Sequence, residues 1–216
     1  MGVTQAAGLS LKWFRDNFCK EEIDIAGTKN ADPYMIMDEM AEKTGIGAGG
    51  LLFLPYLMGE RSPHLDPLCS GLFFGITPSH TKAHFIRSIL EGVAYSLKDS
   101  ISILREDMGI EVNQVRVSGG GAKSSLWKSI QADVFESDIA TVHNSEGPAL
   151  GAAILGGVAC GTFRSVNEAC ELVITTKNMQ EYNKTNANEY NKYYSIYKSL
   201  YPILKNEYKK LRELLL

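Results

Sequence analysis

The feature that most constrains the fold is a glycine-rich loop between a strand-like and a helix-like segment, followed by a second unit of the same order. Strands that alternate with helices are typical of a sheet buried by helices, which predicts an α/β domain. The second unit has a helix of small residues, so another helix or a nucleotide is expected to lie close against residues 147–153. The segments, in order, are strand 115–117, loop 119–121, helix 124–135, strand 139–142, loop 144–147 and helix 148–160.

Hydrophobic spacing predicts the elements of the remaining chain. The helix over 77–109 is the clearest, since about thirty residues at 1.5 Å each give a length of roughly 45 Å. Pro202 is expected to kink the last helix. We expect one domain over residues 1–216 without a linker. The other predicted segments are helices 4–18, 32–45, 165–174 and 186–216, and strands 51–56 and 72–76.

Charge and composition limit the possible partners. The chain has 22 Lys and Arg against 25 Asp and Glu, a net charge of −3. Its overall electrostatic field therefore does not attract nucleic acid, and a phosphate ligand would need a local binding site. No apolar run approaches the ~18 residues of a membrane span, and no secretory signal pattern is present, so we expect a cytoplasmic protein without membrane contact. The four cysteines lack Cys-x-x-Cys spacing and are expected to be reduced packing residues.

The glycine loop sits where α/β proteins let a backbone approach a phosphate or a nucleotide, because the following helix offers free N–H groups. Two familiar types of nucleotide-binding glycine loop do not fit this sequence. A phosphate loop ending at Lys123-Ser124 would need glycine at Val117 and Ala122, and a dinucleotide loop would need a small apolar residue at Ser124. A turn that only permits tight strand–helix packing is the alternative.

Three motifs follow one another along the chain. They are FLPYLMGERSPH at 53–64, GLFFGI at 71–76 continued by HFIRSILE at 84–91, and VSGGGAKS at 117–124. Together they resemble the C-terminal part of the FGGY family of carbohydrate kinases, and the first is most similar to the branch that phosphorylates xylulose.

The resemblance implies a partial C-terminal domain with the actin-like ATPase (ribonuclease H-like) fold, from a two-domain kinase that transfers the γ-phosphoryl group of MgATP to a sugar hydroxyl. D-xylulose is the first expected substrate, while gluconate, ribulose, fuculose and glycerol kinases share the layout. Two alternatives remain: an actin-like nucleotide-binding or regulatory module without kinase activity, and a truncated product whose ligand site is not formed.

The resemblance also implies the residues that hold ATP or ADP. Gly120 would lie against the nucleotide and Ser124 would reach the adenine, while Gly119, Gly121 and Ala122 would shape the slot.

A second set of nucleotide contacts is implied at the N-terminal helix. Gly8 and Lys12 match a helix that touches ADP in the family. For Lys12, a solvated helix charge is an equal alternative.

The same resemblance covers less than half of such a kinase. The sugar site, the catalytic base, the phosphate loops, the Mg²⁺ ligands and the opening strands of the domain would precede Met1, so no catalytic residue is expected here. The chain alone should bind nucleotide weakly and catalyse nothing. Its sheet would have an unpaired edge, which favours a homodimer or association with the N-terminal portion.

Several polar residues are expected to have structural roles. Asp66 is interpreted as a surface-loop residue, Asp99 and Asp107 as helix-face charges, and Asp133 as a non-catalytic residue near the glycine motif. Glu60 and Arg61 are expected to form an exposed ion pair. A capping role is expected for His80 and a packing role for His84, with a metal site the minor alternative.

Overall fold

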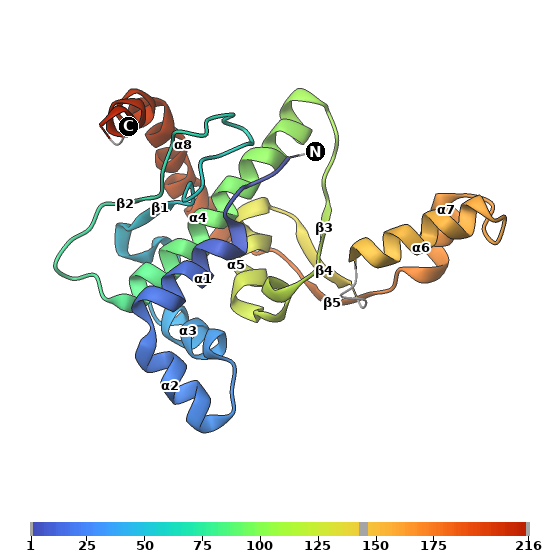
Figure 1. Cartoon of the computed structure of the whole chain (residues 1–216), viewed down its shortest axis with the longest axis horizontal. Coiled ribbons are helices and arrows are strands. Elements are labelled where there is room, and N and C mark those ends of the chain that lie inside the picture. Colours follow the sequence, from blue (N-terminus) through green and yellow to red (C-terminus); the bar gives the residue numbers. More distant parts are fainter. Residues whose placement is uncertain (1, 143–146, 215–216) are drawn as a thin grey trace.

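The structure is a computed structural model that describes residues 2–142 and 147–214, with helices packed around two small sheets (Figure 1). Helices and strands alternate from β3 to α6, which confirms the α/β class. The strands are β1 (Leu52–Leu54), β2 (Leu72–Phe74), β3 (Gln114–Val117), β4 (Asp138–Val142) and β5 (Thr176–Gln180). The helices are α1 (Ala7–Phe18), α2 (Lys20–Lys29), α3 (Pro33–Glu42), α4 (Lys82–Ser102), α5 (Ser125–Phe135), α6 (Gly147–Ala159), α7 (Val166–Val173) and α8 (Lys184–Glu213).

Helix α4 lies at the centre and contacts α1, α3, α5, α8 and β1. It begins after Thr81, not at residue 77, because the Thr81 hydroxyl and the His84 ring form a reciprocal cap. It ends in a π-helical turn over Ile103–Asp107, and Gly109 then has a positive φ of 64°. The regular helix is therefore 21 residues long, shorter than expected. His84 is half-buried and its ring lies 5.3 Å from that of His80, but it also has a capping role that was not expected, since its ring accepts a hydrogen bond from the Thr81 amide at 3.2 Å.

The two sheets differ in how far the sequence predicted them. β1 and β2 pair antiparallel, and β3 and β4 pair parallel, at the expected places. β5 was not expected, because Thr-Lys-Asn-Met-Gln has no apolar alternation, yet it pairs antiparallel with β4. The order β3-β4-β5 leaves β3 with a single partner strand within the described residues.

The C-terminal helix α8 continues through Pro202 and packs through its tyrosines. Tyr194 is buried, whereas Leu211, nearer the C-terminal end of the helix, is 52% exposed. Of the loop expected over 144–147, residues 144–146 lie outside the described residues, as do residues 215–216 of the last helix. Residue 147 already belongs to α6.

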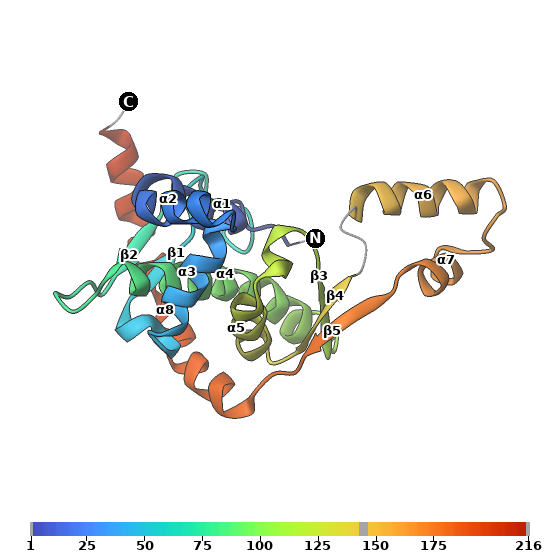
Figure 2. The ribbon, with the colours of Figure 1, turned by 90° about the horizontal axis from the view of Figure 1, so that it is seen from below.

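Helices α6 and α7 project away from the other helices and pack mainly on each other (Figures 1 and 2). α6 is apolar on all sides, yet only Ile154 is buried and Leu155 is 61% exposed. A side chain at Gly147 or Gly151 would meet no atom within 4 Å. Gly147 and Gly151 instead line a cavity of about 380 Å³ together with residues of β3, β4 and α7. No helix therefore packs directly against these two glycines within the described part of the chain, and a nucleotide beside them stays a prediction.

The cysteines only partly match the expected packing role. Cys19 and Cys69 are buried, Cys170 is half-buried and Cys160 is exposed. No helix among residues 2–142 and 147–214 combines the length and apolar character needed to cross a membrane.

A buried charged network joins α4 to α8 and to the loop before β1. Arg87 Nε donates to Glu91 Oε1 at 2.7 Å, and Arg87 Nη2 donates to the Tyr190 hydroxyl at 2.6 Å. The amide of Gly47 donates to the same Glu91 oxygen at 3.0 Å. Gly47 has a φ of 78°, and a side chain there would overlap the Tyr193 ring, so glycine is required.

The contact between α4 and β1 generates a stability prediction. A methyl group at Gly92 would overlap the carbonyl oxygen of Phe53, whereas one at Gly27 on α2 would meet nothing within 4 Å. We expect Gly92→Ala to destabilise the chain by about 1–3 kcal/mol through overpacking. The control Gly27→Ala should stabilise it by about 0.5–1 kcal/mol through helix propensity. Urea unfolding measures both, and equal effects would contradict the close approach.

Candidate functional site

A cavity of about 430 Å³ is enclosed by segments that are far apart in the sequence. The glycine loop and the start of α5 form one wall, α1 and the start of α3 form others, and Leu90 of α4 contributes as well. The cavity is therefore built around the loop that the sequence singled out. Its lining residues are Gly8, Leu11, Asp32, Tyr34, Met35, Asp38, Leu90, Gly120, Gly121, Lys123, Ser124 and Trp127.

The glycine loop has a defined conformation. Gly119 has a φ of 81°, a region that favours glycine, and residues Gly120–Lys123 form a 3-10 turn. The Ser124 hydroxyl then caps α5 by accepting a hydrogen bond from the amide of Trp127 at 2.9 Å. A side chain at Gly121 would overlap the Trp127 ring. Gly119 and Gly121 are therefore explained by the fold itself.

Two glycines of the cavity are not explained in this way. Gly8 and Gly120 both line the cavity, neither has a positive φ, and a Cβ atom at either would meet no protein atom within 4 Å. Small residues on a cavity wall let a ligand approach the backbone closely. The open space next to both glycines belongs to the same cavity.

The structure brings together some of the expected nucleotide residues. Gly8, Gly120, Gly121 and Ser124 line the cavity. Two others, Gly119 and Ala122, belong to the same loop but do not line the cavity.

Lys12 lies outside the cavity lining. Its amine is 2.7 Å from the Asp16 carboxylate, and its side chain is 58% exposed. Its placement matches the solvated helix charge that was the alternative.

Sequence reasoning missed the contribution of α3. Asp32 was predicted only to cap a helix. It does so, because its carboxylate accepts a hydrogen bond from the Tyr34 amide at 3.0 Å. Tyr34, Met35 and Asp38 were not singled out. Burial raises the pKa of Asp38, and the Ser124 hydroxyl opposes this rise. No motif marks these residues, since only the packing of α3 brings them to the glycine loop.

The lining has the character of a nucleoside site more than that of a phosphate site. Tyr34, Met35 and Trp127 offer aromatic and apolar surface. Asp32 and Asp38 bring two carboxylates against the single lysine Lys123, a balance that disfavours several phosphate charges inside the cavity. A flat base with polar edges fits these walls, and phosphates would have to point away from the carboxylates.

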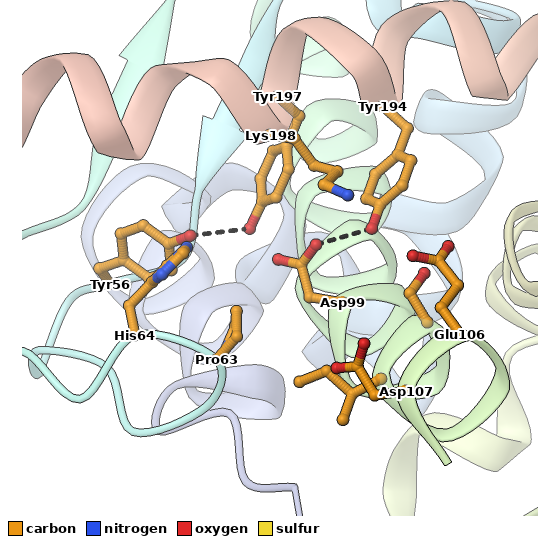
Figure 3. Close-up of a pocket in the computed structure, with 11 residues that line it drawn as sticks. Tyr56, Pro63, His64, Asp99, Glu106, Asp107, Tyr194, Tyr197 and Lys198 are labelled. Atoms are coloured by element: carbon orange, nitrogen blue, oxygen red, sulfur yellow. Dashed lines mark hydrogen bonds between the residues drawn. The ribbon is translucent and has the colours of Figure 1, made fainter. Parts of the chain in front are cut away.

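A second cavity of about 210 Å³ lies between α4, α8 and the loop before β2 (Figure 3). Tyr194 donates to Asp99 at 2.7 Å, and the hydroxyls of Tyr56 and Tyr197 are 3.3 Å apart. Burial raises the pKa of Asp99 to about 6, although the Tyr194 hydroxyl opposes this rise. Asp99 lies on α4 as expected for a helix-face charge, but it is buried there, whereas Asp107 is exposed at the rim.

Other sequence interpretations also need correction. Asp66 is buried and accepts from the Tyr201 hydroxyl at 2.8 Å, so it is not a surface residue. Glu60 is buried and accepts from the amides of Gln5 and Arg61 at 3.0 and 2.7 Å, so the expected exposed ion pair is wrong.

Asp133 has a structural role at the start of α8. Its carboxylate accepts hydrogen bonds from the amide of Asn183 and the side chain of Asn186. Within residues 2–142 and 147–214, no group of three or more histidine, cysteine, aspartate or glutamate side chains could hold a metal ion.

Comparison with solved structures defines the class of protein. A xylulose kinase from Lactobacillus acidophilus matches with a TM-score of 0.82 at 26% identity, over 94% of this chain and 39% of that one. A gluconate kinase from the same organism gives the same TM-score. The chain is thus an α/β domain with the actin-like ATPase fold of sugar kinases.

Sequence comparison gives the family. Residues 1–160 match the C-terminal domain of the FGGY family of carbohydrate kinases, and the chain belongs to this family. Xylulose kinase from Staphylococcus epidermidis is 42% identical over 93% of this chain and 38% of its own length. Gluconokinase from Bacillus licheniformis is 39% identical over 96% of this chain and 40% of its own length. The chain therefore spans about 40% of the length of these curated relatives.

The burial of Asp99 predicts a pH dependence of stability. The unfolded chain loses this proton near 3.8 and the folded chain near 6, so Asp99 should lower the unfolding free energy of the wild type by about 2 kcal/mol as pH rises from 4 to 6.5. Asp99→Asn, which keeps an acceptor for Tyr194, should lack this loss. Its stability relative to wild type should therefore increase over that range.

The control for this experiment is Asp107→Asn, which removes an exposed charge at the same cavity. Urea unfolding at several pH values measures all three proteins. A difference between Asp99→Asn and wild type that stays constant with pH would show that Asp99 ionises normally.

Proposed function

We propose that the chain is the nucleotide-binding part of an ATP-dependent sugar kinase, and that the cavity between α1, α3 and α5 holds the adenosine end of ATP or ADP. The observation that carries this proposal is the pair Gly8 and Gly120. Neither the backbone conformation nor the packing of the chain requires glycine at these two positions, and both border the same cavity. A ligand that lies against both backbones accounts for them.

The other walls support the same ligand. Tyr34 and Trp127 offer aromatic surface to a base, and the Trp127 ring is held by its hydrogen bond from Nε1 to the carbonyl of Leu90 at 3.1 Å. Ser124 and Asp38 provide polar groups for the edge of a purine.

We propose D-xylulose as the first substrate to test for the whole enzyme. The similarity to xylulose kinases at 42% identity supports it, and the similarity to gluconokinases at 39% makes gluconate the direct competitor. The groups that read the sugar hydroxyls, supply the catalytic base and bind Mg²⁺ belong, in this proposal, to the part of the relatives' length that this chain does not span. Mg²⁺, bound with the nucleotide, would neutralise the phosphate charge during transfer.

The structure also suggests where that remaining part would attach. β3 has one partner strand in the described sheet, and the apolar surface of α6 has little cover. Unpaired strand edges and exposed apolar helices favour association. We propose that this face packs against the N-terminal portion of the enzyme, or against a second copy when that portion is absent.

Calorimetric titration with MgADP tests the nucleotide site. We expect the chain to bind MgADP, Gly120→Val to weaken the affinity at least tenfold, and Gly8→Ala to weaken it measurably, because each side chain would enter the cavity without disturbing the fold. The matched control is Gly27→Ala, another helical glycine with open space but outside the cavity lining. Wild-type affinity in both cavity variants, or no binding by the parent chain, would refute the proposal.

A second expectation concerns catalysis. With MgATP and either xylulose or gluconate, the chain alone should form no sugar-dependent ADP, because phosphoryl transfer depends on metal and positioning groups that surround the phosphates. A coupled assay for ADP measures this, with each sugar omitted in turn as the control. Sugar-dependent ADP formation by the chain alone would mean that its own residues supply the catalytic groups.

A further inference from the structure

The hydroxyl of Ser124 already serves as a helix cap. Its oxygen accepts the Trp127 amide at 2.9 Å at the start of α5. The same hydroxyl lowers the pKa of Asp38, against the rise that burial causes. A serine oxygen has two acceptor lone pairs, whereas an ionised carboxylate has about four acceptor sites. Asp38 is therefore the stronger acceptor at this end of the cavity.

We propose that Asp38 determines base specificity by accepting a hydrogen bond from the exocyclic amine of adenine. This inference rests on the proposed nucleotide site and goes beyond it, because it assigns the reading of the base to a residue of α3. An ionised carboxylate only accepts hydrogen bonds. It would therefore favour a purine with an amine at position 6 and disfavour one with a carbonyl oxygen there, which would leave two acceptors facing each other.

The position of Asp38 on α3 supports a contact with the base. Residues three and four apart lie on the same face of a helix, so Asp38 shares a face with Tyr34 and Met35. All three line the cavity, and Trp127 contributes a second aromatic wall. Asp38 is half-buried, and this burial raises its pKa, because the carboxylate has lost part of its water. A donor from the ligand would replace that lost hydration.

Asp32 provides a matched comparison within the same cavity. Its carboxylate also lines the cavity, but it already accepts the Tyr34 amide at 3.0 Å as the cap of α3. Asparagine caps helices as well as aspartate does. Asp32→Asn therefore removes a negative charge from the cavity without removing the cap, and it controls for general electrostatic effects.

The experiment measures by calorimetry the affinities for the Mg²⁺ complexes of ADP, IDP and 2′-deoxy-ADP. It compares the wild type with Asp38→Asn and Asp32→Asn. IDP carries a carbonyl oxygen in place of the adenine amine. We expect the wild type to bind ADP at least tenfold more tightly than IDP, and Asp38→Asn to reduce this preference at least tenfold, because a carboxamide can turn its N–H₂ group toward a carbonyl. Asp32→Asn should shift ADP and IDP affinities equally.

Each outcome decides the proposal. If ADP binds and Asp38→Asn leaves the ADP/IDP ratio unchanged, the inference is wrong while the nucleotide site stands. If Asp38→Asn instead removes discrimination against 2′-deoxy-ADP, Asp38 contacts the ribose, and the inference is again overturned. If the wild type binds no ADP, the proposed function fails and the inference fails with it. Thermal unfolding of the variants confirms that α3 remains folded.

Discussion

The buried ion pair between Arg87 and Glu91 is the interaction on which the arrangement of α4 depends. Glu91 is 1% exposed, and burial raises its pKa, while the charge of Arg87 opposes this rise. A charge removed from water in this way needs partners, and breaking such a pair leaves an uncompensated charge in the core. The partners come from α8, through Tyr190, and from the turn before β1, through Gly47. The pair therefore fixes where three separate parts of the chain meet.

The same helix also positions the candidate site. Leu90 precedes Glu91, and its carbonyl accepts the indole Nε1 of Trp127 at 3.1 Å. That bond orients the ring that fills the space beside Gly121 and forms a wall of the cavity. The Ser124 cap then aligns the first turn of α5 with this ring. The cavity is thus held by main-chain groups of a buried helix, a rigid support of the kind that precise ligand positioning needs.

The sequence predicted best where local chemistry decides the structure. The alternation of strand and helix around the glycine loop, and the cap of α3 at Asp32, follow from short-range patterns and are confirmed. β5 forms because β4 offers it a partner, a tertiary effect that its own residues do not announce. Likewise, Asp66 and Glu60 look like loop polar residues in the sequence, and only the fold gives them buried partners. For the candidate site, the motif indicated the loop, but the wall contributed by α3 depends on long-range packing.

The three glycines of the loop illustrate why a motif alone cannot separate structural from ligand-binding roles. Gly119 is required by its positive φ, and Gly121 by the ring of Trp127. Gly120 has neither constraint and faces the cavity. The sequence cannot distinguish these three glycines, because what distinguishes them arises only in the fold. Gly119 is constrained by its backbone conformation and Gly121 by a neighbouring side chain, whereas Gly120 borders the open space of the cavity. When the first two constraints are accounted for in the structure, the remaining glycine is the one whose small size serves the cavity itself.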